Sequence, residues 1–140
     1  MRDLTSSGLD ERVWQLLSFA TWENRIETEY EKYRCESDYM LYGFIDENEL
    51  VGCIGIQLTG SSSCEIRHIA VDPETRGKSI GRQMIEYVID RHELCHIIAE
   101  TDKDAVEFYR KTGFSINSLG EKYPGVERYN CEWLRNKDIT

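Results

Sequence analysis

The sequence of 140 residues has no long apolar run and contains only two prolines. No stretch approaches the roughly 18 apolar residues of a membrane-spanning helix. The N-terminal segment MRDLTSSGLDERVW lacks the apolar core of a signal peptide. No internal repeat, low-complexity tract or linker rich in proline and glycine divides the chain. We therefore expect one domain over residues 1–140, in the cytoplasm and without a membrane partner.

The cysteines do not have the spacing that a disulfide framework or a zinc site requires. The five cysteines are an odd number, are widely scattered and include no C-x-x-C pair: Cys35, Cys53, Cys64, Cys95 and Cys131. This pattern is unlike a disulfide framework or a cysteine zinc site. We expect reduced thiols that act as small hydrophobic side chains in the core.

Positive charge is scarce relative to negative charge, with 17 Lys and Arg residues against 26 Asp and Glu residues and a net charge of −9. Nucleic-acid phosphates bind to basic surfaces, so we expect no nucleic-acid partner. An acidic surface suits a cationic partner such as an amine, and it equally serves solubility.

Hydrophobic spacing predicts helices and strands that alternate around one sheet. Helical spacing of apolar residues predicts helices over residues 9–20, 24–36, 80–92 and 104–112. Runs with strand character predict a hairpin over residues 39–58, strands over 61–72, 96–101, 114–120 and 127–134, and a very short strand within residues 1–5. The order predicts a mixed α/β domain.

The segment AVDPETRGKSIGRQM, residues 70–84, places small and basic residues where a helix starts. The first N–H groups of a helix are unpaired and carry the positive end of its dipole. Gly77 lets the backbone approach a ligand, and three basic side chains between residues 76 and 82 add charge. The pattern predicts a pyrophosphate cradle. The alternative is a glycine turn beneath a solvated basic surface.

Two familiar nucleotide motifs do not fit this segment. The P-loop pattern G-x-x-x-x-G-K-[ST] needs a glycine at position 72, which is Asp72. The dinucleotide pattern G-x-G-x-x-G is absent as well. We therefore expect neither nucleotide fold.

Residues 76–81, RGKSIG, resemble the acyl-CoA loop [QR]-x-x-G-x-[GA] of the GNAT superfamily of acetyl-CoA-dependent N-acyltransferases, with Ser79 at the position of the usual glycine. A second block, TDKDAVEFYRKTGF at residues 101–114, resembles the family segment N-x-x-A-x-x-F-Y-x-x-x-G-F, with Asp102 at the position of the usual asparagine. Both blocks lie on the expected elements in the family's order. The resemblance is firm over residues 50–115.

The resemblance implies an α/β (α+β) fold with a central mixed, mostly antiparallel sheet flanked by about four helices. It implies acetyl-CoA as the acetyl donor, no metal, and direct transfer to a primary amine of a small molecule or peptide in a ternary complex. It also allows a homodimer. The residues that it implies for cofactor binding are Ile69, Ala70, Val71, Arg76, Gly77, Lys78, Ser79, Ile80, Gly81, Arg82, Asp102 and Tyr109.

The resemblance also implies catalytic roles. Tyr109 matches the family tyrosine beside the cofactor sulfur, which implies that it protonates the leaving thiolate. Glu65 stands where some family members place a general base, and His68 is the alternative base. Each residue also has a structural alternative. These are core packing for Tyr109, a salt bridge for Glu65 and a structural histidine within a strand for His68. Carboxylates of the N-terminal helices are candidates for tuning the acceptor pocket: Glu23, Glu27 and Glu31.

Two other functions compete with this prediction. HELCH, residues 92–96, matches the zinc-protease pattern H-E-x-x-H, but the helical pattern ends near His92, so we expect the two histidines to straddle a turn. A non-catalytic acyl-CoA-binding module is the other alternative, because Ser79 and Asp102 depart from the family pattern. Residues 121–130 are expected to form an acceptor wall, a dimer contact or an ordinary surface loop.

Overall fold

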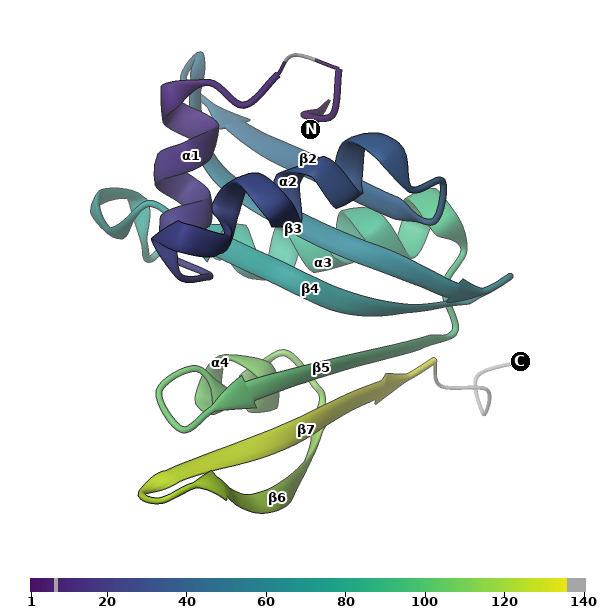
Figure 1. Ribbon diagram of the computed structural model, residues 1–140. Coiled ribbons are helices and arrows are strands. Elements are labelled where there is room, and N and C mark those ends of the chain that lie inside the picture. Colours follow the sequence, from purple (N-terminus) through teal and green to yellow (C-terminus); the bar gives the residue numbers. More distant parts are fainter. Residues whose placement is uncertain (7, 136–140) are drawn as a thin grey trace.

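Seven strands form one sheet in the order β1-β2-β3-β4-β5-β7-β6 (Figure 1). The computed structural model describes residues 1–6 and 8–135. The strands are β1 Arg2–Asp3, β2 Tyr39–Asp46, β3 Glu49–Gly60, β4 Ser63–Val71, β5 His96–Asp102, β6 Ser115–Tyr123 and β7 Val126–Leu134. The helices are α1 Glu11–Ser18, α2 Ile26–Cys35, α3 Ile80–His92 and α4 Val106–Lys111, with 3-10 turns at Glu23–Arg25 and Pro73–Thr75.

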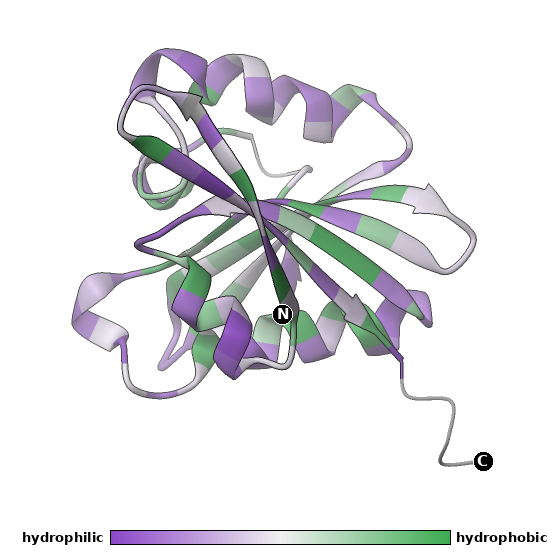
Figure 2. Ribbon diagram, turned by 90° about the horizontal axis from the view of Figure 1, so that it is seen from below, coloured by the Kyte–Doolittle hydropathy of each residue, from purple (hydrophilic) through white to green (hydrophobic). Residues whose placement is uncertain are grey.

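The helices form two layers on opposite faces of the sheet. In Figure 1, α1 and α2 lie in front of the strands, and α3 and α4 lie behind them. Figure 2 shows hydrophobic and hydrophilic residues alternating along the strands between the layers, as expected for a sheet covered by amphipathic helices. Each layer has its own core cluster, one centred on Leu16, Ile26 and Leu41 and the other on Ile54, Met84 and Ile97.

Local chemistry explains where the main elements start and turn. The carboxylate of Asp10 accepts a hydrogen bond from Val13 N at 2.9 Å and so caps α1. Glu47 and Asn48 take positive φ values of 51° and 67°, which closes the tight β2–β3 hairpin. Pro124 and Gly125 form the turn between β6 and β7.

The sheet opens between β4 and β5. These strands run parallel and pair at three positions, Ser63 with His96, Cys64 with Ile97 and Glu65 with Ile98. Beyond Glu65, β4 continues to Val71 paired with β3 alone, and β5 continues to Asp102 paired with β7 alone, among the described residues. The strands therefore diverge toward the end of the sheet at which α3 begins (Figure 1).

The predicted fold class and order of elements are confirmed, with three local differences. Residues 121–130 are a hairpin around a short turn, because β6 and β7 extend to either side of it. On α4 the buried residues are Val106 and Tyr109, whereas helical spacing favours a stripe through Ala105, Phe108, Tyr109 and Thr112. Cysteines 53, 64 and 131 are buried as expected, but Cys35 is exposed. No helix among the described residues is long and apolar enough to cross a membrane.

Candidate functional site

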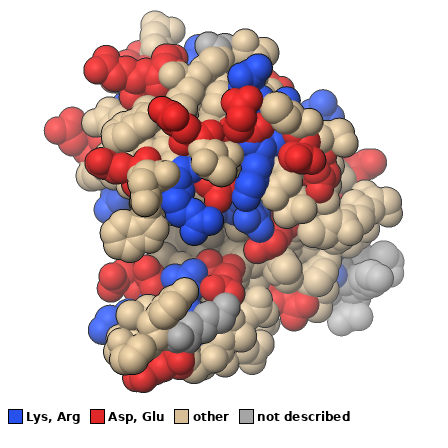
Figure 3. All heavy atoms as spheres, viewed as in Figure 1, with Lys and Arg blue, Asp and Glu red and all other residues tan. Residues whose placement is uncertain are grey.

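A cavity of about 810 Å³ occupies the opening between β4 and β5. It appears in Figure 3 as a hollow across the face of the molecule, bordered by both basic and acidic side chains. Its lining comes from four regions: the end of α1 (Phe19, Ala20), β4 (residues 66–71), the start of α3 (Arg76, Gly77 and residues 79–82), and the β5–α4 segment with one residue of β7 (residues 100–102, 104, 105, 108, 109, 111, 112 and 128).

The loop before α3 has the free backbone donors that a phosphate cradle needs. Among the described residues, no hydrogen bond uses the main-chain N–H groups of residues 76–82. Gly77 has a φ of 97° and open space on the side where a Cβ would lie. Ser79 also takes a left-handed conformation, with φ 57° and ψ 32°, and its side chain makes no cap hydrogen bond. The first turn of α3 thus presents unpaired donors to the cavity.

The basic side chains of this loop have different roles. Arg76 and Arg82 line the cavity, and the Arg82 Nη2 also donates to the Lys111 carbonyl at 2.7 Å. Lys78 points elsewhere: its Nζ lies 2.9 Å from Asp46 Oδ2, and this hydrogen bond raises the pKa of the lysine. Of the residues predicted to bind the cofactor, Lys78 alone is outside the lining.

A contact from α1 fixes the start of the same loop. Arg12 Nη2 lies 2.6 Å from Asp72 Oδ2, and Arg12 Nε donates to the Leu50 carbonyl at 2.7 Å. The other carboxylate oxygen of Asp72 accepts from Glu74 N at 2.9 Å. The hydrogen bond from Arg12, followed by that from Glu74, lowers the pKa of Asp72. The sequence pattern gave no sign of this long-range pair.

Tyr109 places a hydroxyl in the cavity from α4. Its side chain packs edge to face against Phe108 and Phe114, with ring centroids 5.1 and 5.2 Å away. The residue is 4% exposed, and burial raises the pKa of its phenol. Its hydroxyl has no hydrogen-bond partner among the described residues, yet it is not among their fully buried unpaired atoms. The hydroxyl is therefore open to the cavity and free to contact a ligand.

Asp102 performs a structural task at the end of β5. Its Oδ1 accepts hydrogen bonds from Asp104 N at 3.0 Å and Ala105 N at 3.1 Å. A carboxylate serves this turn as well as the amide oxygen of asparagine does. The departure from the family pattern at this position thus keeps the local geometry that leads into α4.

The three backbone positions predicted on β4 lie in the diverging part of the strand. Ile69, Ala70 and Val71 pair with β3 on one side and line the cavity on the other. Because β5 has turned away, the outer edge of β4 has no strand partner here among the described residues. Main-chain groups on this edge are free to contact a ligand.

The carboxylates predicted near the acceptor are not brought into the cavity. Glu65 occupies the last β4–β5 pair, lies 3.5 Å from Arg67 and is outside the lining, because the strands have not yet separated there. The carboxylates at positions 23, 27 and 31 are exposed and also outside it. His68 does line the cavity and is 7% exposed.

The sequence reasoning missed two residues of α2 that lie near His68. Glu29 is 5% exposed, with its Oε1 3.7 Å from Arg25 and its Oε2 3.5 Å from Lys32. Tyr33 is buried and its hydroxyl oxygen lies 2.5 Å from His68 Nδ1. Tyr33 fitted an apolar helix stripe, and nothing local in the sequence pointed to its partner on β4.

The H-E-x-x-H segment does not form a zinc helix. His92 is the last residue of α3, Glu93 is left-handed with φ 50°, and His96 begins β5. The histidines have separate partners: His92 Nε2 lies 2.8 Å from the Tyr42 hydroxyl and His96 Nε2 lies 2.6 Å from Glu132 Oε2. No cluster of three potential metal ligands occurs in the part of the chain that the structure describes.

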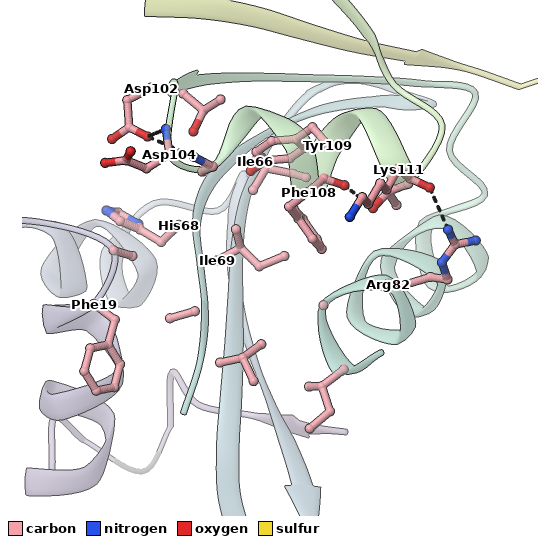
Figure 4. Close-up of a pocket in the computed structure, with 18 of the residues that line it drawn as sticks. Phe19, Ile66, His68, Ile69, Arg82, Asp102, Asp104, Phe108, Tyr109 and Lys111 are labelled. Atoms are coloured by element: carbon pink, nitrogen blue, oxygen red, sulfur yellow. Dashed lines mark hydrogen bonds between the residues drawn. The ribbon is translucent and has the colours of Figure 1, made fainter. Parts of the chain in front are cut away.

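One end of the cavity is basic, and the other is mixed, because Arg67 and Arg128 line it together with acidic side chains. Figure 4 shows Arg82 and Lys111 on one side of Phe108 and Tyr109, and Asp102 and Asp104 on the other. The basic end coincides with the unpaired donors at the start of α3. The arrangement suits an elongated ligand with an anionic part at the basic end.

Comparisons with known proteins agree with this geometry. Residues 37–116 match the acetyltransferase (GNAT) domain. A 78-residue segment is 31% identical to an N-acetyltransferase of Bacillus methanolicus described as uncharacterised, covering 54% of this chain and 65% of that relative. A 107-residue segment is 28% identical to the peptidyl-lysine N-acetyltransferase YjaB of Escherichia coli K12, covering 66% of this chain and 71% of YjaB.

The fold also matches a solved structure over nearly its whole length. A GNAT family acetyltransferase from Elizabethkingia anophelis, solved with acetyl-CoA bound, has a TM-score of 0.72 and 18% sequence identity over 95% of each chain. These findings confirm the fold and the family that the two sequence blocks predicted, and they support an acetyltransferase that uses acetyl-CoA. Because the domain match covers more than half of the chain, the chain belongs to the GNAT family of acetyltransferases.

Proposed function

We propose that the chain transfers an acetyl group from acetyl-CoA directly to a primary amine, with both substrates bound in the cavity together. The cavity that joins the unpaired N–H groups of residues 76–82 to the buried phenol of Tyr109 is the observation that carries this proposal. Acetyl-CoA has the matching shape, because its diphosphate and its thioester lie at opposite ends of a flexible arm. No cysteine is required as a covalent carrier.

The donor is held by the chain's own backbone. The N–H groups of residues 76–82, with Arg76 and Arg82 beside them, bind the diphosphate. The outer edge of β4 at residues 69–71 contacts the pantetheine arm, and an N–H group of this segment stabilises the negative charge that develops on the acetyl oxygen. Lys78 is not part of the lining, and its role is to hold the loop in place through its ion pair with Asp46.

The acceptor approaches the end of the cavity near Asp104 as a cation. An alkylamine is almost fully protonated at neutral pH, and providing its reactive neutral form costs about 4 to 5 kcal/mol. The Asp104 carboxylate, which lines the cavity, attracts the ammonium ion. The ammonium ion loses its proton to water in the cavity, because Glu65, the predicted base, lies outside the lining.

Tyr109 supplies the proton that the leaving group needs. The amine nitrogen forms a bond to the acetyl carbon and loses its second proton to water in the cavity. The carbon–sulfur bond breaks, and the thiolate takes the proton of the Tyr109 hydroxyl. Solvent then reprotonates the phenol. The buried, raised-pKa phenol stays protonated until the thiolate forms.

Replacing Tyr109 with Phe tests this assignment. We expect Tyr109→Phe to lower kcat about 10² to 10³-fold, because only the proton donor is lost, while the Kd for CoA measured by calorimetry stays within about threefold. The matched control is Tyr123→Phe, which removes the hydroxyl of an exposed tyrosine on β6 and leaves kcat unchanged. A kcat near wild type for Tyr109→Phe contradicts the acid role.

The amine class is found by following free CoA thiol across a panel of a lysine peptide, a peptide with a free N-terminus, spermidine and kanamycin. We expect turnover with at least one of them. Saturable CoA binding without turnover on a broader panel would instead support a binding module. Absence of CoA binding at millimolar concentration would refute the proposed function.

Two further expectations remain predictions. Self-association as a homodimer is tested by light scattering, with Tyr123→Glu as the variant because its side chain is exposed on the edge strand β6. A cytoplasmic location is tested by cell fractionation.

A further inference from the structure

Tyr33, Gly55 and His68 form a unit that joins α2 to two strands. Gly55 on β3 is the register partner of His68 on β4. The Tyr33 ring stands over Gly55, where a Cβ would overlap its hydroxyl. The tyrosine hydroxyl thereby reaches His68 Nδ1 at 2.5 Å, and the two rings meet edge to face with centroids 5.7 Å apart.

The hydrogen-bond pattern fixes which nitrogen of His68 carries the proton. Tyr33 is 2% exposed, and among the described residues His68 Nδ1 is the hydrogen-bond partner of its hydroxyl. A buried hydroxyl that fails to donate loses a hydrogen bond at full desolvation cost, so Tyr33 donates and Nδ1 accepts. A neutral imidazole has one N–H group. The proton of His68 is therefore on Nε2.

The Nε2 atom is open to the cavity. His68 belongs to the lining, and Nε2 has no hydrogen-bond partner among the described residues. Among those residues, Glu29 Oε2 is the one fully buried side-chain nitrogen or oxygen without a hydrogen bond, so Nε2 is not fully buried. Figure 4 shows the His68 ring on the same side of the cavity as Phe19, away from Phe108 and Tyr109.

The charges around His68 leave it neutral. Burial lowers the pKa of His68 to about 4, and the nearby cations Arg67, Lys32 and Arg25 act in the same direction. Glu29 on α2 opposes them, with a smaller effect than burial. Tyr33 faces the ring as a neutral phenol, since burial raises its pKa. A neutral imidazole with an occupied Nδ1 is a hydrogen-bond donor and a poor base.

We infer that His68 is a specificity-determining donor whose Nε2–H binds an oxygen acceptor on the amine substrate, and that Tyr33 is the positioning residue that sets its tautomer. The inference rests on the proposed function for the identity of the ligand. It favours amines that carry a hydroxyl, ether or carbonyl oxygen near the reacting nitrogen over plain alkylamines. It also removes His68 as the general base.

Nitrogen NMR of the imidazole tests the tautomer independently of activity. The chain has only three histidines, so His68 is assigned by comparison with His68→Gln. We expect the Nε2–H tautomer at neutral pH, without protonation down to about pH 5. We expect Tyr33→Phe to shift the population toward Nδ1–H. A wild-type Nδ1–H tautomer, or titration near the ordinary histidine pKa, overturns the inference even if the enzyme acetylates amines.

Kinetics with two amide variants test the donor role, with the most active amine of the panel above. The amide nitrogen of glutamine reaches about as far as Nε2 of histidine, so we expect His68→Gln to keep kcat/KM within about threefold. Asparagine is shorter, so we expect His68→Asn to raise the KM for the amine about tenfold and to leave the KM for acetyl-CoA unchanged. Equal loss in both variants, or a loss confined to kcat, overturns the inference. Wild-type turnover in the same assay reports separately on the proposed function.

Discussion

Ser79 holds a left-handed backbone conformation at the position where α3 begins. An L-residue with a side chain pays about 1 to 2 kcal/mol for this conformation, whereas glycine adopts it freely. This cost explains why the related motif has glycine here. The serine still leaves the N–H groups of the loop unpaired, so the donors proposed to bind the diphosphate stay available.

Replacing Ser79 with Gly should stabilise the chain. Relief of the left-handed strain exceeds the entropy that glycine adds to the unfolded state, so we expect a gain of about 0.5 to 1 kcal/mol in the free energy of unfolding, measured with urea. The control is Ser18→Gly at the end of α1, where glycine should cost about 0.5 kcal/mol. A loss of stability in Ser79→Gly contradicts the argument.

The candidate site residues could be predicted from the sequence where they belong to a short local motif. Two short blocks predicted residues 76–82 and Tyr109 as cofactor contacts, and of these only Lys78 lies outside the cavity lining. The place of Glu65 outside the lining could not be predicted, because it depends on where β4 and β5 separate. Tyr33 was missed as a functional residue because its partner is 35 positions away in the sequence.

At the scale of elements, the Arg12–Asp72 pair couples α1 to the cradle loop. The folded-state pKa of Asp72 lies below its ordinary value of 3.8, so the pair contributes stability above that pH and loses it as the pH falls through the folded-state pKa. We therefore expect the stability difference between wild type and Asp72→Asn to be largest near about pH 7 and to shrink at about pH 2.5. Urea unfolding at both pH values measures it, and a constant difference contradicts the coupling.

The close packing of α3 on α4 depends on Gly81. A Cβ at this position would lie 2.6 Å from Cε1 and 2.8 Å from Cζ of Phe108. Gly81→Ala should therefore displace the ring next to Tyr109, with a loss of about 1 to 3 kcal/mol in stability and a higher KM for acetyl-CoA. Phe108→Leu in the same chain should recover part of both losses. Additive losses in the double mutant would rule out this contact as the cause.

Elements were predictable where their hydrophobic period is strong. The hairpin of β2 and β3 and the helix α3 appear within a few residues of their expected positions. The hairpin of β6 and β7 was predicted as two shorter strands, because residues 123–126 around the turn are exposed and show no alternating pattern. Tertiary pairing, which the local sequence does not report, extends both strands.

For the whole molecule, the opening in the sheet divides the fold into two halves. The half with β1–β4 and the half with β5–β7 share three β4–β5 residue pairs and one core cluster. A donor that spans the cavity contacts β4 and α3 on one side and α4 on the other. Binding should therefore tie the halves together.

Hydrogen exchange measures how ligand binding couples the two halves of the sheet. CoA at about 100 times its Kd stabilises the folded state by about 2.7 kcal/mol, which slows globally exchanging amides up to about 100-fold. We expect the slowing to include β5 and β7 as well as the start of α3. Protection confined to residues 76–82 would show that the ligand contacts one half alone.

The glycine beneath Tyr33 has a consequence for how this family member diverges. Any side chain at position 55 collides with the ring carbons of Tyr33 as well as its hydroxyl, so even phenylalanine at position 33 does not make room. A lineage must first shrink residue 33 before residue 55 can change, and losing the tyrosine releases His68. Positions 33, 55 and 68 should therefore be inherited as a block, and homologues that keep all three should share a preference in their amine acceptors.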